Sequence, residues 1–229
     1  MDPVRGIPHT IWHEDLRLEK VMRDIIERAN PDRWVETGTH MGWTSLWVAE
    51  TAPHLPIYTV EVDSTYFQHS AENLENYPQV SIRQGHSPEF LQRLMPLLKT
   101  GVSLFWLDAH WYPPVPLRDE CRVISQLDKY ICVIDDFFCW EPYFHGDTFF
   151  SIYPASGEAT LNSLAYVADI LGTECYRPSY QQGVGGKGYG IFIKGIPFTP
   201  DPELTKLETL SIAEIQEREN LYLKENVVR

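Results

Sequence analysis

Residues 34–42, with the sequence WVETGTHMG, decide how this chain folds. A short apolar run ends at an acid, two glycines follow four residues apart, and residues 42–51 continue with helical character. This order is typical of a buried strand that turns directly into a helix. Glycines allow a tight turn and let a ligand approach the N-terminus of the helix. We therefore predict a strand at residues 34–36, a tight turn and a helix at residues 42–51, with a ligand site at the turn.

The same alternation of apolar runs and amphipathic segments continues along the chain and predicts an α/β fold. It indicates a Rossmann-like, doubly wound sheet that is mostly parallel, has an antiparallel last strand and carries helices on both faces. Further strands are expected at residues 57–62, 80–83, 102–107, 131–134, 174–180 and 189–194, and helices at 16–29, 66–76, from 87, at 117–127 and at 158–171. Ligands of such sheets bind at the carboxyl ends of the strands.

The predicted domain organisation has three parts. Residues 1–30 form an N-terminal helical extension, residues 31–196 form the α/β domain, and residues 197–229 form a charged, helix-prone C-terminal tail. Residues 137–157 form a long aromatic loop, which we interpret either as a wall or lid over the substrate or as a small satellite core.

Charge and composition exclude several classes of partner. The formal net charge is −13 and no lysine–arginine cluster is long enough to follow a phosphate backbone, so nucleic acid is not expected. No apolar run approaches the length that spans a bilayer, so membrane insertion is not expected either. The four cysteines show no C-x-x-C spacing, and together these features favour a cytoplasmic protein with a small-molecule partner. They leave the formation of a homo-oligomer open.

The turn at residues 36–42 has the spacing E-x-G-x-x-x-G, which differs from the dinucleotide fingerprint G-x-G-x-x-G. It resembles the first motif of class I S-adenosylmethionine-dependent methyltransferases. That resemblance implies that Glu36, Gly38, Thr39 and Gly42 surround the methionine end of the cofactor.

Acids at the end of the next strand suit the ribose of the same cofactor. Glu61 is the first candidate and Asp63 the second, because a carboxylate offers two acceptors in one plane to a diol. The resemblance further implies that His86 or Ser87 contacts the adenine edge, although Ser87 is also suited to cap a helix. Asp108 is a further candidate contact of the cofactor, and either His110 or Trp111, which follow it, is a candidate for stacking on the adenine.

Two later stretches, LDAHW at residues 107–111 and VIDD at residues 133–136, make the resemblance specific to one group of methyltransferases. They resemble metal-dependent O-methyltransferases such as catechol O-methyltransferase and bacterial sugar and natural-product methyltransferases. The resemblance implies Mg²⁺ held by Asp108, Asp135 and Asp136. Three carboxylates at one sheet edge would repel one another, and a hard divalent cation relieves that repulsion. The alternative is that Asp135 and Asp136 cap the turn after their strand.

We expect methyl transfer to a hydroxyl group of a small molecule. Asp108 would contribute through the metal. His110 is the candidate general base, because an imidazole titrates near neutral pH. The lysine that follows the corresponding Asp in the catechol enzyme is not matched here, since Trp111 stands at that position. Two alternatives remain open: a metal-free methyltransferase acting on nitrogen or a carboxyl group, and a non-catalytic cofactor-binding or scaffold protein.

Overall fold

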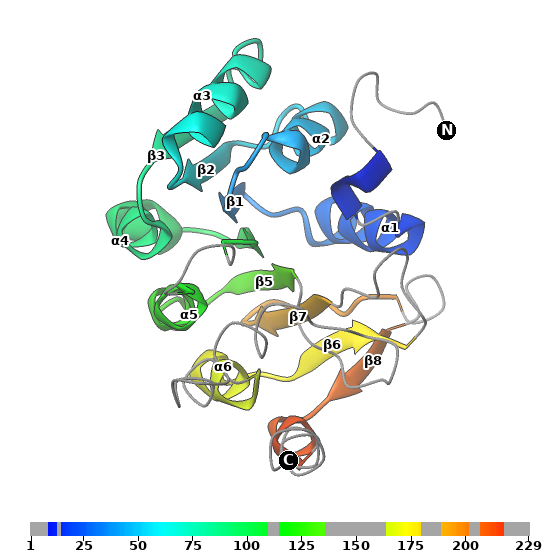
Figure 1. Cartoon of the computed structure of the whole chain (residues 1–229). Helices are drawn as coiled ribbons and strands as arrows, with labels where there is room; N and C mark the ends of the chain where they lie inside the picture. The colour runs from blue at the N-terminus through cyan, green and yellow to red at the C-terminus, as the bar shows by residue number, and fades with distance from the viewer. Residues whose placement is uncertain are drawn as a thin grey trace, which may run out of the picture.

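The computed structural model describes residues 9–12, 15–109, 115–135, 164–179, 189–201 and 207–217. Eight strands form one sheet in the order β3-β2-β1-β4-β5-β7-β6-β8 (Figure 1). The strands are β1 Arg33–Thr37, β2 Ile57–Glu61, β3 Val80–Gln84, β4 Ser103–Leu107, β5 Tyr130–Asp135, β6 Cys175–Pro178, β7 Tyr189–Lys194 and β8 Leu207–Leu210. Strands β1 to β5 pair in parallel, and β7 runs antiparallel to both β5 and β6. This topology confirms the predicted doubly wound sheet.

Helices cover both faces of the sheet. They are η1 His9–Trp12, α1 Leu16–Asp24, η2 Ile25–Ala29, α2 Trp43–Thr51, α3 Ser64–Asn73, α4 Ser87–Leu98, α5 Leu117–Ile124 and α6 Leu164–Leu171. Figure 1 shows α4, α5 and α6 on one side of the sheet and α1 and α2 on the other. The chain order strand, helix, strand therefore produces three layers, as expected for parallel strands that need crossover connections.

Strand alternation divides the core into two clusters. Trp34, Trp106 and Val133 point to the side of α1 and α2. Val35, Phe105 and Ile134 point to the side of α4, α5 and α6. Strands that are buried on both faces have nearly continuous apolar sequences, and for this reason their positions could be predicted from the sequence. Cys132 is fully buried, as expected for a core residue.

Local signals fix most helix boundaries. Asp15 caps α1 by accepting hydrogen bonds from the backbone N–H groups of Arg17 and Leu18. Helix α1 continues into the π-helical turn η2, which ends at Asn30 in the left-handed conformation. The N-cap of α4 is His86, so Ser87 is the first residue of the helix and not its cap. None of the described helices is long and apolar enough to cross a membrane.

The segment after residue 196 differs from the predicted helical tail. Residues 207–210 form β8, which pairs antiparallel with β6 at the edge of the sheet, and residues 212–217 are helical. Leu210 and Ile215 are buried in the same core cluster as α5 and α6. An exposed edge strand favours pairing, and the two apolar side chains anchor this addition to the core.

Candidate cofactor site at the carboxyl ends of the strands

The turn between β1 and α2 is built from left-handed backbone. Gly38, His40 and Gly42 all have positive φ, at 81°, 50° and 80°. The N–H groups of Gly38 and Thr39 both donate to the carbonyl of Val60 in β2, at 3.0 and 3.1 Å. The turn is thereby fixed against the end of the neighbouring strand. Glycine is favoured at two of these positions because it adopts positive φ without a Cβ penalty.

Gly38 also lies close to the end of β4. A Cβ atom at this position would stand 2.5 Å from the carbonyl oxygen of Asp108, which is backbone and has little freedom to move away. The N–H group of Asp108 in turn donates to the carbonyl of Thr37 at 3.0 Å. The carboxyl ends of β1, β2 and β4 therefore meet at one point, and glycine is required there for close approach.

Helix α2 begins directly at this turn. Its N-cap is Gly42, which has no side chain with which to cap the helix. The N–H groups of a first helical turn point out of the N-terminal end, where the helix dipole also favours negative charge. This end is therefore suited to a carboxylate or another anion.

Glu61 ends β2 and is 6% exposed. Its Oε2 accepts a hydrogen bond from the N–H of His40 at 2.7 Å, and its Oε1 accepts one from the N–H of Asp63 at 2.9 Å. These bonds hold the carboxylate against the glycine turn. Each carboxylate oxygen has a further lone pair, so Glu61 retains the capacity to accept from a diol.

Glu36 near the end of β1 is the most deeply buried carboxyl group of the site, at 1% exposure. Its Oε2 accepts hydrogen bonds from the hydroxyl of Ser45 in the first turn of α2 and from the hydroxyl of Thr59 in β2, the latter at 2.7 Å. The hydroxyl of Thr59 also lies 2.6 Å from that of Thr39 in the turn. Glu36 thus joins β1, β2, α2 and the turn in one polar network.

Burial raises the pKa of Glu36 to about 7, against an ordinary value of 4.5. The hydrogen bonds from Ser45 and Thr59 act in the opposite direction, and the charge of Glu61 adds a smaller upward effect. Desolvation dominates because a buried carboxylate loses its hydration.

The remaining predicted cofactor residues occupy the neighbouring strand ends. Asp63 caps α3, with its Oδ1 accepting from the N–H groups of Thr65 and Tyr66. His86 is exposed and Ser87 is buried at the start of α4, directly after β3. Among the residues that the structure describes, no neighbouring atom lies within 4 Å of the position that a Cβ would take at Gly85.

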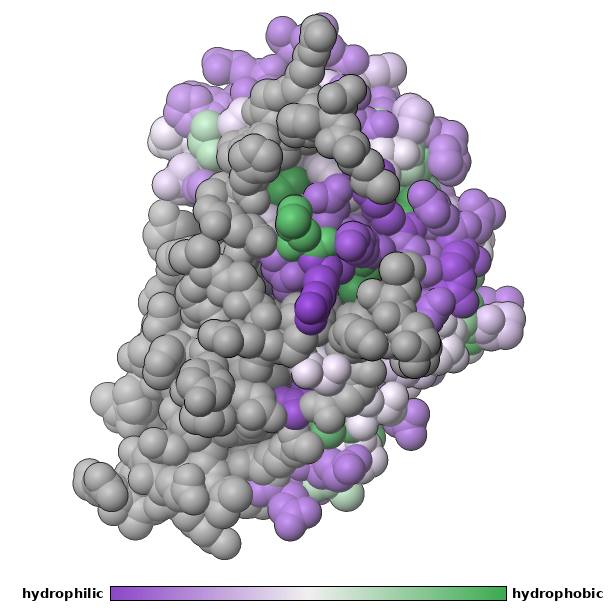
Figure 2. Space-filling model, turned by 90° about the vertical axis from the view of Figure 1, so that its right-hand side faces the viewer, coloured by the Kyte–Doolittle hydropathy of each residue, from purple (hydrophilic) through white to green (hydrophobic). Residues whose placement is uncertain are grey.

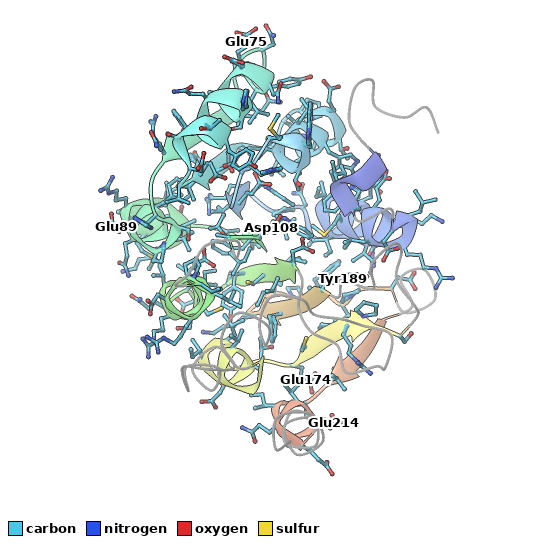
Figure 3. The ribbon with its side chains drawn as sticks, viewed as in Figure 1. Glu75, Glu89, Asp108, Glu174, Tyr189 and Glu214 are labelled. Atoms are coloured by element: carbon cyan, nitrogen blue, oxygen red, sulfur yellow. The ribbon has the colours of Figure 1, made fainter. Side chains whose placement is uncertain are left out.

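The structure describes two of the three predicted metal ligands, Asp108 and Asp135. Leu107 and Ile134 are register partners, so Asp108 and Asp135 follow at the same level on adjacent parallel strands. Asp108 lies at the middle of the sheet edge, and Tyr189 starts β7 opposite Asp135 (Figure 3). Among the described residues, no group of three or more His, Cys, Asp or Glu side chains is arranged to hold a metal. Asp136, His110 and Trp111 lie outside the described residues, as does the loop 137–157.

Ser45 and Thr59 are the site residues that sequence reasoning missed. Thr59 lies two residues before Glu61 and is the register partner of Glu36, so strand alternation places all three on one face. That pattern is readable once the pairing of β1 with β2 is assumed. Ser45 carries no comparable signal, because its position depends on how α2 packs.

Figure 2 views the molecule from the right-hand side of Figure 1, and its described surface is largely hydrophilic with a small hydrophobic area. Among the described residues, the large hydrophobic side chains that are exposed are Leu16 and Val62. Val62 follows Glu61 directly and is 41% exposed, so it lies beside the candidate site.

No protein-family model matches this chain, and no curated protein matches it in sequence. Solved structures are similar in fold. An O-methyltransferase from Bacillus cereus in complex with S-adenosylhomocysteine is 12% identical, with a TM-score of 0.58 over 82% of this chain and 84% of that chain. The O-methyltransferase TomG from Streptomyces achromogenes, in complex with S-adenosylmethionine, is 18% identical, with a TM-score of 0.55 over 79% and 78%.

A spermidine synthase from Thermotoga maritima is 13% identical, with a TM-score of 0.54 over 94% of this chain and 76% of that chain. The sheet of this chain is mostly parallel with an antiparallel β7, and helices cover both faces. The chain has the Rossmann-like fold of class I S-adenosylmethionine-dependent methyltransferases.

Proposed function

We propose that this protein is an S-adenosylmethionine-dependent methyltransferase that transfers a methyl group to a hydroxyl of a small molecule with the help of a divalent metal. The observation that carries the proposal is the pair of buried carboxyl groups, Glu36 and Glu61, on either side of the glycine turn. S-adenosylmethionine carries a carboxylate, an ammonium group and a ribose diol, and this turn offers a complementary group for each.

Each part of the cofactor has a candidate partner. The N-terminal end of α2 suits the carboxylate, as helix N-termini suit anions. Glu36 suits the ammonium group, because no described residue donates to its Oε1. Glu61 suits the ribose hydroxyls, with His86 or Ser87 and the predicted stacking residue Trp111 at the adenine.

The metal part of the proposal rests on the donor chemistry at the next two strand ends. Asp108 and Asp135 lie at the same level on neighbouring strands, and Asp136 follows Asp135 in the sequence. Oxygen ligands of this kind suit Mg²⁺. A divalent ion there would lower the pKa of a bound hydroxyl group. His110 is the proposed acceptor of the proton of that hydroxyl group. The site must also align the hydroxyl oxygen with the methyl group of the cofactor.

The metal role is tested by calorimetric titration with Mg²⁺ and by methyl transfer from labelled S-adenosylmethionine to a panel of hydroxyl compounds, with and without chelator. We expect Asp108→Ala to lose the Mg²⁺ signal and the activity while retaining S-adenosylhomocysteine binding. Asp169→Ala, an exposed position on α6, serves as the matched control and should behave as wild type.

Activity that survives chelation would contradict the metal role and favour methyl transfer to nitrogen or a carboxyl group without metal. Full activity in Asp108→Ala would contradict the assignment of this ligand. Tight cofactor binding with no transfer to any acceptor would favour the non-catalytic alternative.

A further inference from the structure

The two oxygens of Glu36 have different environments. Oε2 is held by the hydroxyls of Ser45 and Thr59, whereas no described residue donates a hydrogen bond to Oε1. Within the sheet the group is enclosed, with Thr59 of β2 and Trp106 of β4 as its register partners. A fixed carboxyl group with one acceptor atom left over is arranged to receive a donor from a ligand.

Charge compensation at Glu36 is absent from the neighbouring elements that the structure describes. Glu61 on β2 is the ionisable neighbour, and its charge opposes a second negative charge. The residues of α2 and β4 that face Glu36 are Ser45 and Trp106, which do not titrate in the neutral range. A cation placed at Oε1 would therefore be the first positive charge that this carboxylate meets.

From this geometry we propose that cofactor binding is linked to proton release at Glu36. When the ammonium group of the cofactor docks at Oε1, the carboxyl group loses its proton to solvent and remains a carboxylate in the complex. Cofactor affinity consequently falls as the solution becomes acidic. This inference rests on the proposed function, because it needs a ligand with an ammonium group in this site.

The direction of the effect follows from linkage. In the free protein the pKa of Glu36 is about 7, so the carboxyl group is mainly protonated at pH 6 and mainly ionised at pH 8. A ligand that binds the ionised form must displace the proton at the lower pH. If one proton is displaced, the dissociation constant rises at most about tenfold for each pH unit below the free pKa.

The test is calorimetric titration of the full chain with S-adenosylhomocysteine at pH 6 and pH 8, each in two buffers of different ionisation enthalpy. We expect about tenfold tighter binding at pH 8. At pH 6 we expect release of close to one proton per ligand bound. Methylthioadenosine, which lacks the ammonium and carboxylate groups, should bind with the same affinity at both pH values.

A variant separates Glu36 from other titrating groups. Glu36→Gln keeps an acceptor for Ser45 and Thr59 but cannot ionise, so it should bind S-adenosylhomocysteine more weakly at pH 8 and without pH dependence. Glu75→Gln, at an exposed position on the segment after α3, is the matched control and should keep the wild-type dependence (Figure 3).

Equal affinity at pH 6 and pH 8 in the wild-type protein, without proton release, would overturn the inference while leaving the proposed function intact. A pH dependence that persists in Glu36→Gln would overturn it as well. These two measurements do not depend on each other, so a variant that fails to fold leaves the wild-type titration decisive. Failure to bind S-adenosylhomocysteine at either pH would instead contradict the proposed function itself.

Discussion

The backbone at position 38 requires glycine. Two separate features demand glycine: its φ of 81°, and the 2.5 Å that would separate an added Cβ from the carbonyl oxygen of Asp108. A residue other than glycine at this positive φ would lower the stability by about 1 kcal/mol. The contact of its Cβ with the carbonyl of Asp108 would also force the ends of β1 and β4 apart.

Gly38→Ala is predicted to lower the free energy of unfolding by about 3 kcal/mol and to weaken cofactor binding, because the turn must shift. Chemical denaturation and titration with S-adenosylhomocysteine measure the two effects. Gly172→Ala is the matched control, because Gly172 has a similar φ of 66° but an added Cβ there would lie 4.0 Å from the nearest described atom, the carbonyl oxygen of Asp169. An equal loss in both variants would mean that the contact with Asp108 does not matter.

The raised pKa of Glu36 also makes the free energy of unfolding depend on pH. Its folded pKa of about 7 lies above the ordinary value of 4.5, so the folded state binds more protons between these two values. The contribution of this group to stability is therefore largest below pH 4.5, falls as the pH rises to 7 and changes little above that.

Replacing Glu36 by Gln removes this ionisation. Relative to wild type, Glu36→Gln should gain about 1–3 kcal/mol in unfolding free energy between pH 5 and pH 8. Denaturation curves at several pH values measure the difference. A difference that does not change with pH would show that Glu36 is not the group that titrates.

At the scale of elements, the buried strands could be predicted from the sequence, whereas the edge strand β8 could not. The apolar runs around Trp34, Phe105 and Val133 identify buried parallel strands, and each lies within two residues of its predicted bounds. Strand β8 was missed because its four residues, LETL, carry an i, i+3 spacing that also suits a helix. Pairing with β6 decides its conformation, and that partner is more than 25 residues away in the sequence.

The packing of the segment after β8 can be tested at Leu210. Leu210→Ala should lower the free energy of unfolding by about 2–4 kcal/mol, because this side chain is 5% exposed in the core cluster of α5 and α6. Leu16→Ala is the control, since Leu16 is 70% exposed and its loss should cost about 0.5 kcal/mol or less. A cost at Leu210 no larger than at Leu16 would mean that β8 adds nothing to the fold.

Across the whole molecule, the topology explains why site residues far apart in the sequence meet. Parallel strands bring their carboxyl ends to one edge, so Glu36, Glu61 and Asp108 converge although they are 72 positions apart from first to last. The sequence predicted this convergence from strand order. It could not predict the hydroxyl partners of Glu36, because Ser45 and Thr59 reach it only through the packing of α2 and β2.

The central claim is that this edge of the sheet binds S-adenosylmethionine, and calorimetric titration with S-adenosylhomocysteine tests it most directly. We predict binding in the micromolar range by wild type and by the control Glu75→Gln. Glu61→Gln should bind about tenfold more weakly or worse, because an amide cannot accept from His40, Asp63 and the ribose together. Absence of binding by the wild-type protein would contradict the claim.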